Sequence, residues 1–234
     1  DLCAVEEAEE FMEHVPARQP FMATSCCPAW SVMAKKLFPD FKPYISMALT
    51  PMVLTGRLIK KEKPNAKVVF IGPCAAKKLE ASRRSIRSDV DFVLTFEEVM
   101  GMFVAKGVNL EQISVSDPLT EGTGSGRGFA VSGGVAEAVK NQILKDHPDM
   151  EVKVQAAEGL KNCKTMLMMA KAGRLNGYLL EGMACPGGCV AGAGTLQPVM
   201  KSSTLVKKYV KEADKQISSE SAYSSNLNLL TEHE

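Results

Sequence analysis

The sequence predicts an α/β fold in which most strands run parallel. Short apolar segments alternate with amphipathic segments along most of the chain, which is the pattern of successive β and α units. Three cysteine-containing segments each follow a predicted strand, as expected where loops at the carboxyl ends of parallel strands carry a functional site. With 234 residues and 45% apolar content, the chain can bury a substantial core as one large domain or as two lobes.

The alternation can be followed in order along the chain. Apolar residues at helical spacing predict helices over residues 5–15, 30–37, 52–63, 97–105, 135–146 and 163–172. Short apolar runs predict strands over residues 20–25, 67–71, 91–95, 151–157 and 178–183. The glycine-rich residues 122–128 lack the order of a nucleotide-binding loop, so we expect a flexible or tightly turned connection there. The polar tail after Lys201 should be helical and then frayed.

Charge and hydropathy argue against two classes of partner. The 28 basic residues nearly cancel the 27 acidic ones, and a net charge of +1 gives no electrostatic reason to expect nucleic acid. No apolar run approaches the roughly 20 residues that a membrane-spanning helix needs. Nothing at the start resembles a signal peptide, so we expect this thiol-rich chain in the cytoplasm.

Five of the seven cysteines lie in three short segments, residues 24–30, 72–80 and 181–189. Loops that follow buried strands can bring thiolates together from different directions, which an iron–sulfur cubane requires. Structural zinc, which usually has paired Cys-x-x-Cys knuckles, and plain buried thiols are weaker alternatives, and the odd number of cysteines disfavours disulfides. The four candidate iron ligands are Cys27, Cys74, Cys185 and Cys189.

Three cysteines remain outside this set. Adjacent side chains on an extended backbone point to opposite faces, so Cys26 should seldom reach the same cubane as Cys27. A spare thiol beside a metal site suggests a chemical role. Cys3 and Cys163 stand alone in ordinary segments, and we expect both to be small core residues.

The three segments resemble the signature motifs of the iron-only, or [FeFe], hydrogenase catalytic domain. The matching patterns are Thr-Ser-Cys-Cys-Pro-x-Trp, Pro-Cys-x-x-Lys-x-x-Glu and Glu-x-Met-x-Cys-x-x-Gly-Cys, and the similarity runs to about Gly194. The resemblance implies a two-lobed α/β domain over residues 1–200, with mainly parallel sheets flanked by helices and the cofactor between the lobes. Residues 201–234 would form a helical tail. The family domain begins earlier than Asp1, so its amino-terminal portion would be another segment or chain.

The resemblance implies an H-cluster, which is a [4Fe-4S] cubane joined through a cysteine sulfur to a diiron unit with carbon monoxide, cyanide and azadithiolate ligands. The four candidate ligands would hold the cubane, and Cys189 would also bridge to the diiron unit. Cys26 would be the acid–base thiol beside the azadithiolate amine. Lys77, one helical turn beyond Cys74, would donate to a cyanide ligand. The remaining residues expected to contact the cofactor are Ser25, Pro73 and Met183.

A proton route is also implied, because heterolytic splitting of hydrogen leaves a proton that must reach water. Glu7 and Glu10 are three residues apart on one helical face and match the glutamates of the family route, and Ser46 matches its serine. Without the resemblance, both glutamates would be interpreted as ordinary solvated residues of an acidic helix.

The implied activity is the reversible conversion of hydrogen into two protons and two electrons. The electron partner would be a ferredoxin-like carrier or accessory iron–sulfur domains, and maturation proteins would load the diiron unit. The alternatives are a non-catalytic iron–sulfur scaffold of cluster assembly, against which the presence of Cys26 and Cys189 argues, and a sensory hydrogenase.

Two departures from the family pattern favour slow turnover or sensing. Gly72-Pro73-Cys74 stands where catalytic members have Met-Pro-Cys, which predicts a roomier pocket. Met52 stands where they have Gln in Ser-Pro-Gln, which exchanges a hydrogen-bonding amide for a weakly accepting thioether.

Overall fold

A computed structural model describes residues 1–114 and 121–231. It contains two parallel sheets. The first is three-stranded, in the order β1 (Met22–Ala23), β5 (Tyr178–Met183) and β4 (Lys153–Glu158). The second pairs β2 (Val69–Gly72) with β3 (Phe92–Thr95), and Gly72 lies opposite Thr95. The predicted α/β class with parallel strands is therefore confirmed, although β1 is shorter than the predicted residues 20–25.

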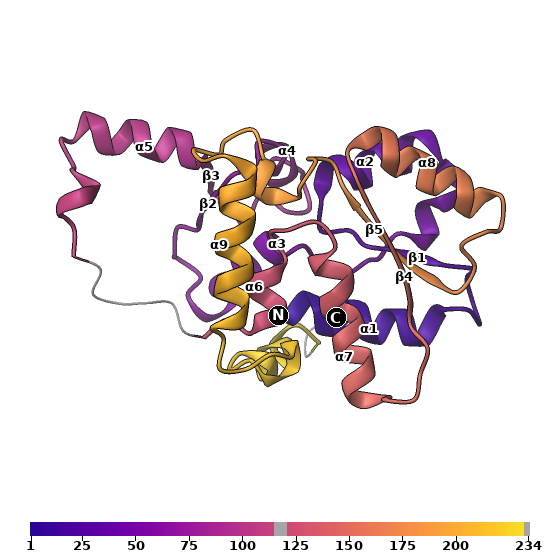
Figure 1. Cartoon of the computed structure of the whole chain (residues 1–234). Coiled ribbons are helices and arrows are strands. Elements are labelled where there is room, and N and C mark those ends of the chain that lie inside the picture. The colour runs from indigo at the N-terminus through magenta and orange to yellow at the C-terminus, as the bar shows by residue number, and fades with distance from the viewer. Residues whose placement is uncertain (115–120, 232–234) are drawn as a thin grey trace.

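Helices cover both faces of the three-stranded sheet (Figure 1). On one face α1 (Leu2–His14) and α7 (Gly134–Asp146) enclose a core that includes Phe11, Val139 and Leu179. On the other face α2 (Pro28–Leu37) and α8 (Leu160–Lys171) enclose a second core, which includes Trp30 of α2 and Leu180 of β5. Successive residues of β5 thus enter opposite cores, because side chains alternate along a strand.

The two-stranded sheet is covered less completely. Residues of α3 (Pro51–Glu62) pack with Phe70 and Val93 from its strands, and α4 (Ala76–Ala81) follows β2. By contrast, α5 (Phe96–Ala105) projects from the body together with the short helix η2 (Leu110–Gln112), and it contributes no buried residue (Figure 1). Phe92 of β3 is 60% exposed, so one face of this sheet is open to solvent in the chain by itself.

The glycine-rich segment differs from the expected connection. It forms the five-residue helix α6 (Gly124–Gly128), whose first turn is capped by the Thr123 side chain accepting the N–H of Gly126. A Cβ on Gly134 would lie 2.0 Å from the carbonyl oxygen of Gly128, so the start of α7 packs directly on this backbone. The glycines therefore permit a close approach between two helices.

The carboxyl-terminal region is more ordered than the predicted frayed tail. It contains α9 (Val199–Lys211), which packs on α6 and on η3 (Cys189–Ala191). Three short helices follow: η4 (Ser218–Glu220), η5 (Ser224–Leu227) and α10 (Asn228–Thr231). Ser218 and Ser221 are buried, so the segment is held by packing and does not fray there. A further short helix, η1 (Pro39–Tyr44), follows α2. Across the described ranges, the structure has no helix with the length and apolar character needed to cross a membrane.

Candidate active site

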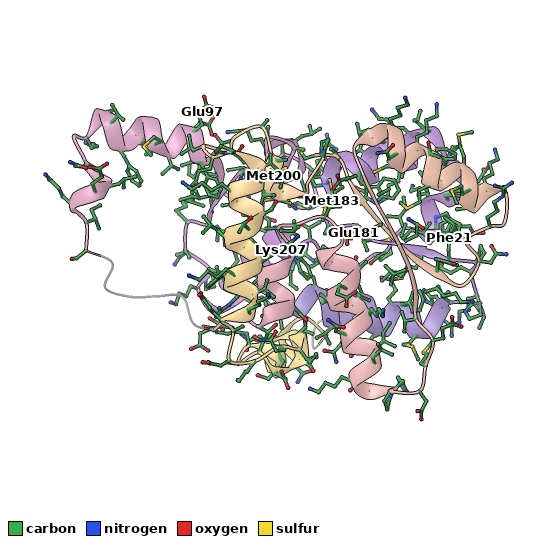
Figure 2. All side chains as sticks on the ribbon, viewed as in Figure 1. Phe21, Glu97, Glu181, Met183, Met200 and Lys207 are labelled. Atoms are coloured by element: carbon green, nitrogen blue, oxygen red, sulfur yellow. The ribbon has the colours of Figure 1, made fainter. Side chains whose placement is uncertain are left out.

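The three cysteine loops meet at one cavity of about 260 Å³. Cys26 and Cys27 follow β1, Cys74 follows β2, and the loop with Cys189 follows β5, so strands of both sheets direct their carboxyl ends to the cavity. The predicted contact residues Pro73, Lys77 and Met183 also line it. Figure 2 shows Met183 near the middle of the molecule, whereas Phe21 lies toward one end.

Cys185 does not line this cavity, but it lies in the third loop directly after Ala184. Burial first, and then the neighbouring Cys27 and Cys74, raise the pKa of Cys185 and raise that of Cys189 to about 12. The Sγ atom of Cys27 accepts the backbone N–H of Ala184 at 3.5 Å, which joins the first loop to the third. The structure thus brings Cys27, Cys74 and Cys189 to one cavity and places Cys185 in the loop that carries Cys189.

This donor set fits an iron–sulfur cluster. In a cubane each cysteine thiolate binds a different iron. The four cysteine sulfurs therefore surround the cluster and need not converge on a single ion. Within residues 1–114 and 121–231, no group of three or more histidine, cysteine, aspartate or glutamate side chains is arranged to hold one metal ion. Thiols on three loops around a cavity are the arrangement that a cluster would use.

Cys26 and Cys27 both line the cavity, so a thiol outside the predicted ligand set lies beside that set. The strand has ended at this point, because Cys27 is the N-cap of α2 and Pro28 starts the helix. That Cys26 is not itself a ligand stays a prediction. Burial, followed by the charges of Glu7 and Glu181, raises the pKa of the Cys26 thiol.

A series of polar groups lies between this region and the surface. Glu7 is 2% exposed, and its Oε1 atom accepts the backbone N–H of Ser25 at 3.2 Å. Ser46 donates its hydroxyl to Oε2 of Glu10 at 2.6 Å, and the N–H of the exposed Met47 also reaches Glu10. Burial raises the pKa of Glu7 to about 8, while the Ser25 N–H acts in the opposite direction. The second carboxyl oxygen of Glu7, Oε2, is buried and has no hydrogen-bond partner among the described residues, so no direct hydrogen bond joins Glu7 to Ser46. Glu7 and Glu10 thus lie at the buried and the outer ends of a row of polar groups that is interrupted between Glu7 and Ser46.

Ser25 and Lys77 make contacts that the sequence did not predict. Ser25 does not line the cavity; its hydroxyl donates to the Ala48 carbonyl at 2.9 Å while its N–H holds Glu7. Lys77 does line it, but its Nζ atom lies 2.7 Å from Oε2 of the buried Glu80. It also donates to the Cys26 carbonyl at 3.4 Å. Its ammonium group is therefore held in place by Glu80 at one edge of the cavity.

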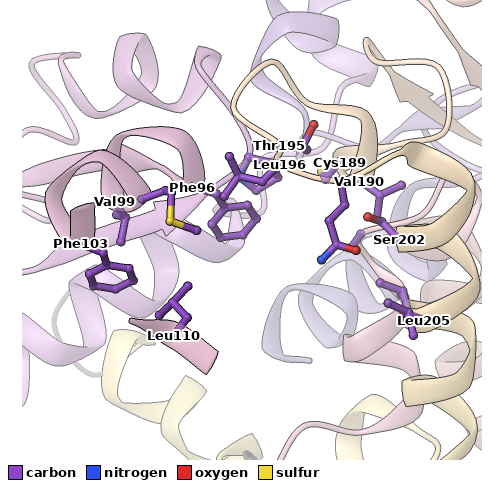
Figure 3. A pocket seen from close by; sticks show the side chains of 15 residues that line it. Phe96, Val99, Phe103, Leu110, Cys189, Val190, Thr195, Leu196, Ser202 and Leu205 are labelled. Atoms are coloured by element: carbon purple, nitrogen blue, oxygen red, sulfur yellow. The ribbon is translucent and has the colours of Figure 1, made fainter. Parts of the chain in front are cut away.

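A second groove, of about 540 Å³, lies between α5 and α9 (Figure 3). Phe96 and Phe103 on one side face Leu205 on the other, and Cys189 borders the groove between them. Because Cys189 and Pro73 line both the groove and the cavity, their loops form the partition between the two spaces.

Comparison with known proteins agrees with these features. Residues 1–193 match the family described as "Iron only hydrogenase large subunit, C-terminal domain". The chain belongs to this family.

Relatives of this hydrogenase-family chain include two kinds of protein. It is 32% identical to the periplasmic [Fe] hydrogenase large subunit of Nitratidesulfovibrio vulgaris, over 86% of this chain and 58% of that protein. It is 29% identical to cytosolic iron-sulfur assembly component 3 of Rattus norvegicus, over 82% of this chain and 50% of that protein. The chain spans about half the length of the curated relatives it matches.

Solved structures show the same fold. A variant of [FeFe]-hydrogenase HydA1 from Chlamydomonas reinhardtii superposes with a TM-score of 0.74 and 22% sequence identity. The alignment covers 100% of this chain and 78% of that one.

One residue of the hydrogenase motifs has a structural role that sequence reasoning missed. Glu181 is fully buried on β5, where its carboxylate accepts the N–H groups of Gly133 and Ala136, both at 2.7 Å. These donors lie at the amino-terminal end of α7, and Gly133 has a φ of +87°. Glu181 therefore fastens α7 to the strand that leads into the third cysteine loop. The sequence signal for this role is Glu181 itself, a charged residue within a predicted buried strand and the first residue of the Glu-x-Met-x-Cys-x-x-Gly-Cys motif.

The predicted roomier pocket at Gly72 is wrong. A Cβ at position 72 would lie 2.8 Å from Cε1 of Phe70, so an aromatic ring already occupies that space. Phe70 and Met52 both line the cavity. The space beside position 72 therefore depends on the residue two positions earlier on the strand as well as on position 72 itself.

Proposed function

We propose that this chain is the H-cluster domain of an [FeFe]-hydrogenase that converts hydrogen reversibly into two protons and two electrons. The observation that carries the proposal is the row of acid–base groups between the Cys26 region and the surface, which consists of buried Glu7 and the hydrogen-bonded pair of Ser46 and Glu10. A site that splits hydrogen must move a proton through protein to water, and this row has the required acid–base groups.

Each residue of the site would have its own role in this reaction. Cys27, Cys74, Cys185 and Cys189 would hold the cluster, and Cys189 would carry its diiron unit. When bound, the H-cluster would supply the site of hydrogen chemistry and accept or deliver the electrons. The Cys26 thiol would exchange a proton at Sγ, and the buried Glu7 carboxyl would pass it toward Ser46 and Glu10. Lys77, held by Glu80, would donate to the cofactor from the cavity edge.

The rival function is a non-catalytic scaffold for cluster assembly, which the cluster-assembly relatives favour. A scaffold needs the ligand thiols, but cluster assembly does not require the buried carboxyl group of Glu7, the Ser46 hydroxyl or the Cys26 thiol. These acid–base groups therefore support the enzyme. We further propose low turnover or a sensory output, because Met52 lines the cavity where fast family members have a hydrogen-bonding glutamine.

The electron partner would be a ferredoxin-like carrier or accessory iron–sulfur domains, and maturation proteins would load the diiron unit. The relatives' names place one protein in the periplasm and another in the cytosol, so the cytoplasmic location of this chain stays a prediction.

Infrared spectroscopy and hydrogen assays of the matured protein test the proposal. Cys26→Ala should keep the carbon monoxide and cyanide bands while turnover falls by about 10²–10⁴-fold, because only the proton-transfer group is removed. Cys189→Ala should lose the bands with the diiron tether. Glu9→Gln on the exposed side of α1 is the matched control and should keep both bands and turnover. A wild-type protein that has been produced together with the maturation proteins and still lacks these bands would favour the scaffold instead.

A further inference from the structure

The aromatic ring beside Gly72 explains why this position lacks a side chain. A Cβ there would lie 2.8 Å from Cε1 and 2.9 Å from Cζ of Phe70, closer than real Cβ contacts. Residues two apart on a strand point to the same side of the sheet, so side chains at 70 and 72 compete for one space. In this chain Phe70 fills it.

The Phe70 ring is held by neighbours from other elements. It packs against the buried cluster of Met52, Val53 and Val90, to which α3 contributes the first two residues. Met52 is 4% exposed and lines the same cavity as Phe70. A side chain at position 72 would displace the Phe70 ring. The ring would then lose its contacts with this cluster, and the cavity is the space beside the ring.

We propose that Phe70 forms the wall of the cofactor cavity in place of the residue at position 72, and that the two positions are coupled: with the Phe70 ring in its observed position, a side chain at 72 would overlap the ring. The cofactor part of this inference rests on the proposed function, whereas the coupling rests on packing alone. Together with Met52, Phe70 makes this wall entirely apolar. Changing Gly72 to methionine therefore does not restore the family arrangement, because it adds a second large side chain to an occupied space.

Thermal unfolding of the protein produced without maturation proteins tests the coupling. The set consists of the wild type, Gly72→Met, Phe70→Ala and the double variant, with Gly101→Met as control. Gly72→Met should lower Tm by about 2–12 °C, because overpacking is destabilising at a filled position. The same change in the Phe70→Ala background should cost much less, because the ring is gone. A Cβ on Gly101 meets no atom within 4 Å, so the control should keep Tm within a few degrees of wild type. An equal Tm loss in both backgrounds would overturn the coupling.

Infrared spectra of the matured variants test the cofactor wall. Phe70→Ala should shift the carbon monoxide and cyanide bands, since their surroundings lose an aromatic face, and the double variant should give a third set of positions. Wild-type bands in the Phe70→Ala protein would refute the wall. If the wild type itself shows no such bands while the Tm effects are coupled, the proposed function fails and the packing relation between 70 and 72 stands.

Discussion

Replacing Glu7 by glutamine tests the interior of the proposed proton path without removing its shape. Glutamine has nearly the same size and can still accept the Ser25 N–H through its amide oxygen, but it has no proton to exchange. In the matured protein, turnover should fall by about 10²–10⁴-fold at neutral pH.

The same substitution has a consequence for stability that needs no cofactor. Burial raises the pKa of Glu7 from 4.5 to about 8, so the folded chain keeps this proton between those pH values while the unfolded chain releases it. Stability from this group is therefore fully present below the unfolded pKa and is lost as pH rises toward 8. The loss is about 1.4 kcal/mol per pH unit, or on the order of 4 kcal/mol from pH 5 to pH 8.

Urea denaturation at pH 5, 6, 7 and 8 measures this effect. The free energy of unfolding of the wild type, minus that of Glu7→Gln, should decrease steadily across the series. Glu9→Gln, which removes an exposed carboxylate two residues away, should leave the wild-type slope nearly unchanged. If the difference between wild type and Glu7→Gln were constant with pH, Glu7 would be ionised in the folded chain, and the argument for a buried proton carrier would fail.

Two further substitutions test how the cysteine loops are supported. Gly182→Ala should destabilise the fold by about 1–3 kcal/mol in urea denaturation, because the new Cβ would lie 2.2 Å from the fully buried ring of Trp30. The control Gly101→Ala, on the open surface of α5, should be neutral or slightly stabilising. Glu181→Gln should cost about 1–3 kcal/mol, because its amide NH₂ group would face one of the two N–H donors of α7; a loss below 0.5 kcal/mol would contradict this anchoring role.

The sequence predicted features that depend on local pattern. The helices, the parallel strands and the position of each cysteine loop after a strand are confirmed, because periodicity and chain-breaking residues are local signals. The structure also brings Cys26, Cys27, Cys74 and Cys189 to one cavity, where the motifs had suggested a common site.

The features that were missed depend on contacts between distant segments. Helix α6 has poor intrinsic propensity because of its glycines, and it is held by the Thr123 cap and by packing against α7 and α9. The anchoring of α7 by Glu181 joins residues far apart in the chain. The filling of the space at Gly72 by Phe70 was accessible in principle, since it follows from strand alternation.

The positions of the four predicted ligand thiols in the chain have a consequence for folding stability. They come from loops of both sheets and from distant parts of the chain, so a bound cluster would cross-link segments that the unfolded chain leaves independent. Binding to the folded form alone stabilises it by mass action. A chain that holds a cluster would therefore unfold less often, and resist proteolysis longer, than the same chain without one.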